Sequence, residues 1–388
     1  MERVNRRAVL TGLAVAAVPP PAGRAPGDPA SPHSTRSPAS LLERHVDAVG
    51  QNATTPLQEL SGTLTPSDLH FSRHHFGTPA VDPTTYELFV HGLVGRPMAL
   101  TLDDLKRFPS RCRIYFIECA GNGAGAFHRP RATMSAQAVD GATSNSEWVG
   151  VPVASVLAES GVRPEASWLL AESLDAGRYA RSIPLGKVYD DALLAYAQNG
   201  EPLRTEQGFP VRLLLPGWEG SASVKWLRRL ELLSRPAMTR HETARYTDVT
   251  PDGKIHPFEF VMGVKSTLTH PTYPQVVARG WTEIRGLAWS GHGRIARVDV
   301  STDGGVSWMP AELDAPVLSK AHTRFRLGWT FEGEAAVLMS RAVDEAGNVQ
   351  PTLEQFKASR PPGNDYRNNA IRAWRVAPDG QVTFATGL

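Results

Sequence analysis

The feature that most constrains the fold of this chain is a change of sequence pattern close to residue 250. Before it, helix-like and strand-like segments are mixed; after it, short strand-like segments follow one another with turns between them. Residues 294–301 alternate polar and apolar side chains and run into Thr302-Asp303-Gly304-Gly305, which is a hairpin sequence. Residues 335–343 precede another turn sequence. Repeated short strands of this kind predict a β-sandwich of immunoglobulin type.

The first part of the chain mixes helices with strands. One helix-like segment is capped by Thr101 and stopped by Pro109, and another ends at Gly161. We expect helices at residues 102–108 and 152–160, and strands at residues 168–171 and 211–215. We therefore predict an α+β fold, with a mixed domain at residues 41–250 and a sandwich domain at residues 254–388, joined by a turn sequence.

The amino terminus has the pattern of an export signal. Arg6 and Arg7 precede an apolar stretch over residues 8–18, which prolines follow. The stretch is too short to span a bilayer, and paired arginines before it are typical of the twin-arginine route, which exports folded proteins. An ordinary signal peptide or a chance basic start is the alternative. We expect residues 1–39 to be signal and linker, and the mature chain to be periplasmic without a membrane span.

The composition excludes several classes of site. A formal net charge of +2 without a basic run gives no basis for binding nucleic acid. With 2 cysteines and no C-x-x-C-H sequence, the chain has no attachment site for a c-type haem and too few cysteines for an iron–sulfur cluster. Hydrophobic content of 41% and charged content of 21% are typical of an ordinary globular protein.

One cysteine stands where a thiol can act. Residues 111–117 are rich in aromatic and β-branched residues and predict a strand, and Cys119 follows ahead of a loop that begins with Gly121. Such a thiol can ligate a metal or attack a substrate, whereas a small buried apolar residue is the alternative. Cys112 would lie on the opposite face of the strand and roughly 20 Å away at about 3.3 Å per residue. That separation excludes a disulfide.

A polar segment before the first predicted helix is a candidate for binding. Arg73 and His75 stand between aromatic residues and could hold an anion or phosphate, although a solvated loop is the alternative. His70 and His74 have the i, i+4 spacing of a helical zinc site. The neighbouring phenylalanines and prolines argue against a helix there, and so against zinc.

A second polar segment, residues 207–226, could cradle a phosphate. Its glycines can expose backbone N–H groups, while Arg212 and Lys225 add positive charge. The alternative is a strand, a turn and a strand with charges on the surface.

Taken together, these segments resemble the sulfite oxidase family of molybdenum–molybdopterin enzymes. The matching motifs are Arg73-His74-His75, Glu118-Cys119-Ala120-Gly121-Asn122, Ala195-Tyr196, Asn199-Gly200, Gly208-Phe209-Pro210-Val211-Arg212 and Val224-Lys225-Trp226-Leu227. The likeness covers residues 60–385. Within the family the chain looks most like SoxC, the molybdenum subunit of bacterial sulfane dehydrogenase. That likeness rests on Pro216-Gly217-Trp218-Glu219-Gly220, Lys225-Trp226-Leu227-Arg228-Arg229, Glu242-Thr243-Ala244-Arg245-Tyr246-Thr247-Asp248 and Gly286-Leu287-Ala288-Trp289-Ser290-Gly291.

The resemblance implies a molybdopterin-binding domain followed by a molybdenum-cofactor dimerisation domain, in a homodimer or a heteromer. Cys119 would be the thiolate ligand of molybdenum, since a soft thiolate suits a redox metal. Arg73 would hold an anionic substrate by forked hydrogen bonds, and Tyr246 would donate a hydrogen bond at the metal centre. The residues expected to grip the pterin and its phosphate are His75, Gln207, Arg212, Ser223 and Lys225, with Ser173 and Asp175 as further contacts.

The chain departs from sulfite oxidases at positions that bear on the substrate. Gly123 and Ala124 stand where those enzymes carry arginines, Ala138 stands near the place of a pocket tryptophan, and Gln207 replaces a histidine. Less positive charge should weaken the hold on free sulfite and favour a bulkier or protein-bound sulfur substrate.

We therefore expect oxidation of a sulfane sulfur on a carrier protein, with electrons passing to a separate c-type cytochrome subunit. Within the same fold, the alternatives are dehydrogenation of a small sulfur oxyanion such as sulfite, and reduction of a compound such as methionine sulfoxide. An exported binding module that has lost its cofactor is the alternative from another class.

Overall fold

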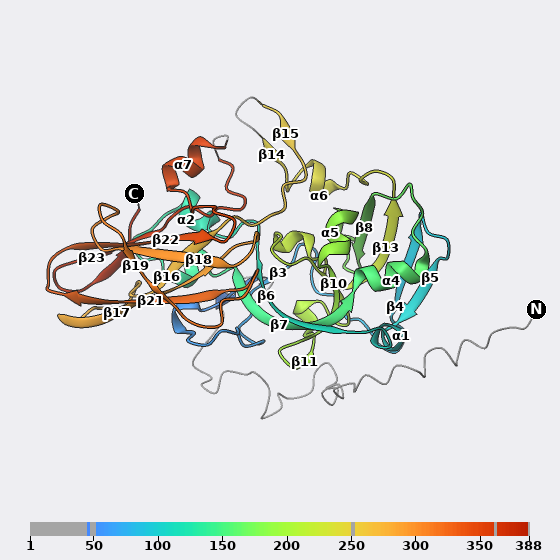
Figure 1. Cartoon of the computed structure of the whole chain (residues 1–388), viewed down its shortest axis with the longest axis horizontal. Helices are drawn as coiled ribbons and strands as arrows, with labels where there is room; N and C mark the ends of the chain where they lie inside the picture. Colours follow the sequence, from blue (N-terminus) through green and yellow to red (C-terminus); the bar gives the residue numbers. More distant parts are fainter. Residues whose placement is uncertain (1–44, 47–51, 250–252, 361–362, 387–388) are drawn as a thin grey trace, which may run out of the picture.

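The computed structural model describes residues 45–46, 52–249, 253–360 and 363–386. The predicted export signal and residues 250–252 of the predicted turn lie outside the described residues. Figure 1 shows two parts side by side, a mixed part coloured mainly cyan to yellow and a β-sandwich coloured orange to red. The predicted α+β class with a C-terminal sandwich is confirmed. Among the described helices, none combines the length and the apolar character needed to cross a membrane.

Two sheets form the frame of the mixed part. Among the described residues, one sheet has the order β11-β10-β7-β6, with β12 also paired to β10, and the other has the order β5-β4-β13-β8-β9. The strands of the first sheet are β6 (Arg111–Glu118), β7 (Thr143–Pro152), β10 (Leu193–Gln198), β11 (Glu201–Pro202) and β12 (Arg212–Leu214). Those of the second are β4 (Glu87–Gly92), β5 (Met98–Thr101), β8 (Trp168–Ser173), β9 (Ala180–Pro184) and β13 (Leu227–Leu233).

Short helices connect these strands, and their ends follow the sequence signals. Helix α1 begins after Thr101, whose hydroxyl accepts the backbone N–H of Asp104 at 3.1 Å while the Asp104 carboxylate accepts the N–H of Thr101. Helix α4 ends at Gly161, which has a φ of 67°. The helical segments are η1 (Leu57–Glu59), α1 (Leu102–Lys106), α2 (Ala124–His128), α3 (Ala136–Asp140), α4 (Val153–Ser160), α5 (Leu185–Asp190), η2 (Thr205–Gln207), η3 (Gly220–Ala222), α6 (Arg240–Thr243) and α7 (Leu353–Ala358).

The sandwich is built from two antiparallel sheets. In the described part of the chain their orders are β16-β17-β21-β20 and β19-β18-β22-β23-β24. Trp289, Trp374 and Phe325 fill the space between them and are fully buried. The strands are β16 (Lys265–His270), β17 (Gly280–Trp289), β18 (Ile295–Ser301), β19 (Met309–Pro310), β20 (Glu312–Leu313), β21 (Thr323–Phe331), β22 (Ala336–Asp344), β23 (Ala373–Val376) and β24 (Val382–Phe384).

The two parts share a core instead of meeting only at a surface. The hydrophobic cluster of the sandwich also includes Leu57, Phe116 and Val139 from the mixed part. Two further small sheets occur in the described structure. Strands β1 (His45–Val46), β2 (Asn52–Thr54) and β3 (Ser72–Arg73) form one sheet, and β14 (Asp248–Val249) with β15 (Ile255–His256) form a hairpin that projects beside α6 (Figure 1).

Candidate functional site

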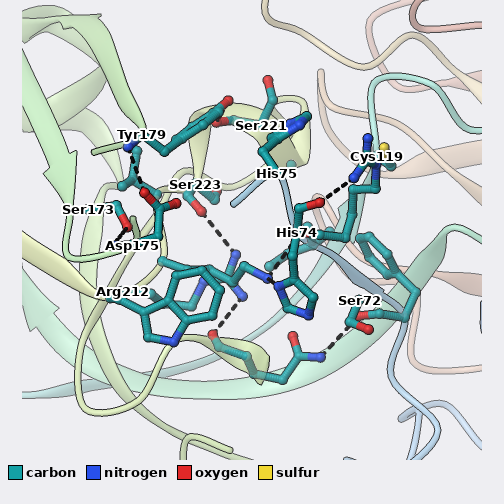
Figure 2. A pocket seen from close by; sticks show the side chains of 18 of the residues that line it. Ser72, His74, His75, Cys119, Ser173, Asp175, Tyr179, Arg212, Ser221 and Ser223 are labelled. Carbon is teal, nitrogen blue, oxygen red and sulfur yellow. Dashed lines mark hydrogen bonds between the residues drawn. The ribbon is translucent and has the colours of Figure 1, made fainter. Parts of the chain in front are cut away.

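A cavity of about 660 Å³, counting the space at its mouth, opens in the mixed part. Every residue that the sequence analysis proposed as catalytic or cofactor-binding lines this cavity: Arg73, His75, Cys119, Ser173, Asp175, Gln207, Arg212, Ser223, Lys225 and Tyr246. Figure 2 shows Ser173, Asp175, Arg212 and Ser223 on one side of the cavity and Cys119 on the other.

The lining comes from segments that are far apart in the sequence. Strand ends and the loops after them supply nearly all of it, which suits binding groups held on a rigid frame. The contributing segments are residues 70–75 around β3, residues 117–119 at the end of β6, residues 173–179 after β8, residues 207–212 between η2 and β12, residues 220–226 around η3, and Tyr246.

Cys119 lies directly after β6, as the strand prediction required. Its backbone N–H donates to the carbonyl of Ala142 at 2.9 Å, and its carbonyl accepts the N–H of Asn122 at 2.9 Å. The side chain is half-buried, and burial raises the pKa of the thiol, while the backbone N–H of Gly121 and the charge of Arg73 act in the opposite direction. Cys112 is exposed and does not line the cavity. The thiol that faces the cavity is therefore Cys119.

Arg212 is a buried cation that forms no ion pair with a carboxylate of the described residues. Its guanidinium donates to the carbonyls of Gln207 and Ser223, each at 3.1 Å, and its Nε has no partner among the described residues. Burial lowers the pKa of Arg212 to about 9. A buried charge of this kind is costly unless something compensates it.

Lys225 is a second cation in the same wall, and its side chain is partly buried. Its Nζ contacts the carbonyls of Arg73 and Glu206 at 3.1 and 2.9 Å and Nδ1 of His74 at 2.8 Å. Burial, followed by the charge of Arg212, holds the pKa of Lys225 well below its usual value. Within the described residues neither cation forms an ion pair with a carboxylate, so this wall suits an anionic group such as a phosphate.

A glycine lets the chain fold closely around these two cations. Gly208 follows η2 with a φ of 105°. A Cβ at this position would lie 3.0 Å from Cβ of Lys225 and 3.2 Å from Cβ of Arg212. Only glycine combines this backbone conformation with so close an approach.

His75, Tyr179 and Tyr246 also line the cavity, and His241 packs against the first two of them. His75 Nε2 lies 2.7 Å from the Tyr246 hydroxyl, its ring stacks on Tyr179 at 5.4 Å, and His241 lies 5.6 Å from it. Partial burial, reinforced by Arg73 and His241, lowers the pKa of His75 to about 4. Burial raises the pKa of Tyr246 well above its usual value. At neutral pH both groups are therefore uncharged, and the ring nitrogen that carries the proton of His75 decides which of the two donates this hydrogen bond.

Arg73 lies at the edge of the cavity and is exposed. Its Nη1 donates to Oδ1 of Asn52 at 3.1 Å and to the carbonyl of His74. His70 and His74 flank β3 in an extended segment, not a helix, so their spacing does not bring them to one face. The sequence argument against zinc at these two residues is in agreement with this geometry.

Three of the four departures from sulfite oxidases lie outside the lining of the cavity. The family resemblance implies that Gly123, Ala124, Ala138 and Gln207 change the substrate pocket, and among the described residues that line this cavity only Gln207 occurs. Arg372 from the sandwich reaches Gly123 instead, and its Nη2 fills the place where a Cβ of that residue would stand. Arg372 is itself buried, lies 3.5 Å from Oδ1 of Asp140 and is not among the described residues that line the cavity, so it does not replace those arginines there.

Several lining residues escape sequence reasoning. His74, Tyr179, Ser221 and Trp226 line the cavity, and His241 packs on Tyr179 at 4.2 Å. His74, Ser221 and Trp226 stand inside segments that the sequence singles out, but Tyr179 carries no local signal of function. It joins the site only because the fold brings residues 173–179 to residues 220–226.

Two protein families match the chain. The family described as "Oxidoreductase molybdopterin binding domain" matches residues 75–241. The family described as "Mo-co oxidoreductase dimerisation domain" matches residues 257–371. The first range includes Cys119, Arg212 and Lys225.

Among curated proteins, the similar ones include sulfite oxidases and nitrate reductases. Mitochondrial sulfite oxidase of Rattus norvegicus is 34% identical over 328 residues, which cover 77% of this chain and 60% of the relative. Sulfite oxidase of Gallus gallus is 35% identical over 325 residues, which cover 77% and 71%. NADH nitrate reductase 2 of Phaseolus vulgaris is 32% identical over 343 residues, which cover 77% and 38%. The chain thus spans about 60% of the length of the first of these relatives.

A solved structure agrees with this chain over nearly its whole length. The sulfane dehydrogenase SoxCD from Paracoccus pantotrophus superposes with a TM-score of 0.87 and a sequence identity of 42%. The match covers 96% of this chain and 98% of that chain.

Proposed function

The chain belongs to the sulfite oxidase family of molybdopterin oxidoreductases, and we propose that it oxidises a sulfane sulfur carried on a protein. The likeness to sulfane dehydrogenase SoxCD, over nearly all of both chains, supports this substrate above others. Each turnover would take one oxygen atom from water and release two electrons and two protons.

The observation that carries the proposal is the pair of cations without carboxylate partners in the cavity wall. Arg212 and Lys225 would bind the phosphate of a molybdenum–molybdopterin cofactor. Ser223 and Gln207 line the same cavity, and their polar side chains would also contact the cofactor. Ser173 and Asp175 line the same wall and would contact the pterin. These residues fit the cofactor, because the negative charge of its phosphate would compensate the two cations.

When bound, the cofactor would supply the two-electron redox change and the transfer of oxygen. Cys119 would ligate the molybdenum as a thiolate, which a soft, redox-active metal favours. Arg73 would turn its planar guanidinium toward an anionic substrate at the mouth of the cavity and hold it by two hydrogen bonds. Tyr246 would keep its proton and donate a hydrogen bond to the reacting oxygen, a role that its raised pKa supports.

The electrons would leave to a separate c-type cytochrome subunit. The chain has 2 cysteines and no C-x-x-C-H sequence, so it has no means of attaching such a haem itself. We further propose that the chain is exported to the periplasm by the twin-arginine route, as Arg6 and Arg7 indicate. The C-terminal sandwich, which matches a dimerisation family, would serve a homodimer or a heteromer.

Direct oxidation of free sulfite is the second candidate. The sulfite oxidases of rat and chicken are at least 34% identical to this chain, which supports sulfite as a substrate. Gly123, Ala124 and Ala138 are not among the described residues that line the cavity, so the arginines and the tryptophan that they replace give no argument against sulfite.

Steady-state assays separate the two candidates. The chain, loaded with cofactor and mixed with a c-type cytochrome, is given either a carrier protein bearing a persulfide or free sulfite. We expect kcat/KM to be at least about tenfold higher for the carrier, and Arg73→Met to lower kcat/KM for both substrates. A preference for free sulfite would replace the first candidate with the second, and no turnover of either would contradict both.

A further inference from the structure

A buried carboxylate stands immediately before the proposed metal ligand. Glu118 is the last residue of β6, and its side chain is 1% exposed. Successive side chains of a strand point to opposite faces. Cys119 faces the cavity, and Glu118 points away from it into the sandwich, where its partners lie.

Three donors surround the two oxygens of this carboxylate. Lys265 Nζ lies 3.0 Å from Oε1, and Asn122 Nδ2 donates to the same oxygen at 2.9 Å. Trp289 Nε1 donates to Oε2 at 2.7 Å. Lys265 and Trp289 belong to β16 and β17 of the sandwich and are buried. The sandwich therefore contacts Glu118, the residue next to Cys119, directly.

The charges around Glu118 are balanced inside the protein. Lys265 also lies 2.8 Å from Oδ1 of Asp140, and Arg372 from the sandwich lies 3.5 Å from the same atom. Two cations thus face two carboxylates, all of them buried. No charge is left over for a ligand, so this cluster is not itself a binding site.

The same contacts hold the loop that follows Cys119. Asn122 donates from Nδ2 to the carbonyl of Asp140 at 3.0 Å, and its Oδ1 accepts the N–H of Ala142 at 3.0 Å. The carbonyl of Ala120 accepts the N–H of Arg367 at 2.7 Å, and Arg367 in turn pairs with Glu219 at 2.6 Å. Hydrogen bonds on both sides of the thiol thus tie this loop to distant parts of the chain.

We propose that Glu118 is a positioning residue through which the sandwich, by Lys265 and Trp289, fixes the Cys119 thiolate in the cavity. The inference rests on the proposed function in taking Cys119 as a metal ligand. Partners that orient a metal ligand typically change affinity or activity by about 10- to 100-fold when they are removed.

A double variant can distinguish positioning of Cys119 by Glu118 from a contribution of Glu118 to stability alone. A buried ion pair can be replaced on both sides by neutral groups with little loss of stability, whereas removal of one partner leaves a charge unpaired. The double variant Glu118→Gln/Lys265→Met leaves Asp140 and Arg372 as a balanced pair. A glutamine, however, has one acceptor oxygen and cannot accept from both Asn122 and Trp289 in the way that the two carboxylate oxygens do.

The test compares four proteins in a Cys112→Ser background, which leaves Cys119 as the only thiol. They are the parent, Lys265→Met, the double variant Glu118→Gln/Lys265→Met, and Lys320→Met as the matched control. Lys320 also joins the sandwich to the mixed part, at 2.6 Å from Asp191, without contacting residues 118–122 by any ion pair or hydrogen bond in the described structure.

Two measurements are made on each protein. The first is the alkylation rate constant of Cys119 in cofactor-free protein, taken at its high-pH limit so that it reports access to the thiolate and not its ionisation. The second is the visible thiolate-to-metal band and kcat in cofactor-loaded protein. Thermal unfolding is recorded alongside.

We expect the double variant to regain most of the stability that Lys265→Met loses. Its limiting alkylation rate should still rise at least fivefold over the parent, its visible band should shift and its kcat should fall about tenfold or more. The control should keep the parent's alkylation rate and band. A double variant with the parent's alkylation rate, band and kcat would overturn the proposal. Absence of molybdenum from the parent would count against the proposed function alone, because the alkylation arm needs no cofactor.

Discussion

At the scale of single residues, two buried arginines have opposite environments. Arg181 pairs with Glu219 at 3.0 Å and lies 3.7 Å from Glu242, whereas the hydrogen bonds of Arg212 to other described residues go to carbonyls. Both are almost wholly buried. We therefore infer that Arg181 stabilises the fold, whereas Arg212 binds an anionic ligand.

This contrast predicts opposite effects of the same substitution. In cofactor-free protein, Arg212→Met should raise the free energy of unfolding by about 1 to 3 kcal/mol, because it removes an uncompensated buried charge. Arg181→Met should lower it by about 3 to 5 kcal/mol, because it takes a buried partner away from Glu219. Denaturant unfolding measures both. A strongly destabilising Arg212→Met would mean that the guanidinium is structural.

A second residue-scale prediction concerns pH. The pKa of His75 is about 4 in the folded chain, below its usual value of 6.5. The unfolded chain binds this proton first, so the stability contributed by neutral His75 is complete above pH 6.5 and is lost as the pH falls toward 4. Cofactor-free protein should therefore become less stable over this range, and His75→Gln should make the slope shallower. An unchanged slope in His75→Gln would contradict the lowered pKa of this ring.

The sequence predicts the side chains of the site better than it predicts their contacts. Cys119, Arg73, His75, Arg212 and Lys225 can be singled out from local pattern. Other lining residues follow from the family resemblance, namely Ser173, Asp175, Gln207, Ser223 and Tyr246, whereas Tyr179 follows from neither. Neither indicates that His75 bonds to Tyr246 at 2.7 Å or that Tyr179 stacks on it. Such contacts depend on side chains that the folded sheets bring together, and no local pattern records them.

At the scale of elements, the turn after η2 shapes the cation wall. Gly208 has a φ of 105° and lies against the side chains of Arg212 and Lys225. Gly200 has a φ of 78°, but no atom lies within 4 Å of the point where a Cβ would stand. The two glycines carry similar backbone constraints but differ in what surrounds them.

Alanine at these glycines should therefore separate backbone strain from crowding. Both variants should lose about 1 to 2 kcal/mol from the positive φ. Only Gly208→Ala should also push Arg212 and Lys225 apart, and it should lower cofactor content at least severalfold. Metal analysis of both purified variants checks this. Equal cofactor contents would show that the close approach at Gly208 is not needed for binding.

Most elements follow from local sequence, and the exceptions have physical causes. Helix α1 begins after the cap at Thr101, and helix α4 ends at Gly161, as predicted. The hairpin after β18 is longer than Thr302-Asp303-Gly304-Gly305 suggests, because β19 begins only at Met309. Asp303 accepts hydrogen bonds from Ser307 and so extends the turn. Side chains set the length of this loop, and the strand alternation does not reveal it.

At the scale of the whole molecule, buried charges cross between the two parts. Glu118 and Asp140 of the mixed part pair with Lys265 and Arg372, and Glu219 pairs with Arg367. If either part unfolded alone, these charges would lose their partners in a buried setting. We therefore expect a single cooperative unfolding transition by calorimetry for the cofactor-free chain. Two separate transitions would mean that the crossing pairs contribute little to coupling.

The sequence indicates two parts but not this coupling. A change of pattern near residue 250 suggests a hinge, whereas the structure continues the sandwich core into Leu57, Phe116 and Val139. Glu118 and Lys265 are separated by 147 positions. Pairings over such separations are set by the packing of whole sheets, and the composition of either part does not reveal them.

The most direct test of the central claim is the molybdenum content of the folded, exported chain, measured by metal analysis with a visible spectrum. We predict one molybdenum per chain in the wild type, and almost none in Arg212→Met/Lys225→Met, which lacks both cations of the wall. We predict that Cys119→Ala loses the thiolate-to-metal band together with turnover. Folded wild type without molybdenum, from a host that makes the cofactor, would contradict the account, and so would a double variant with a full complement of metal.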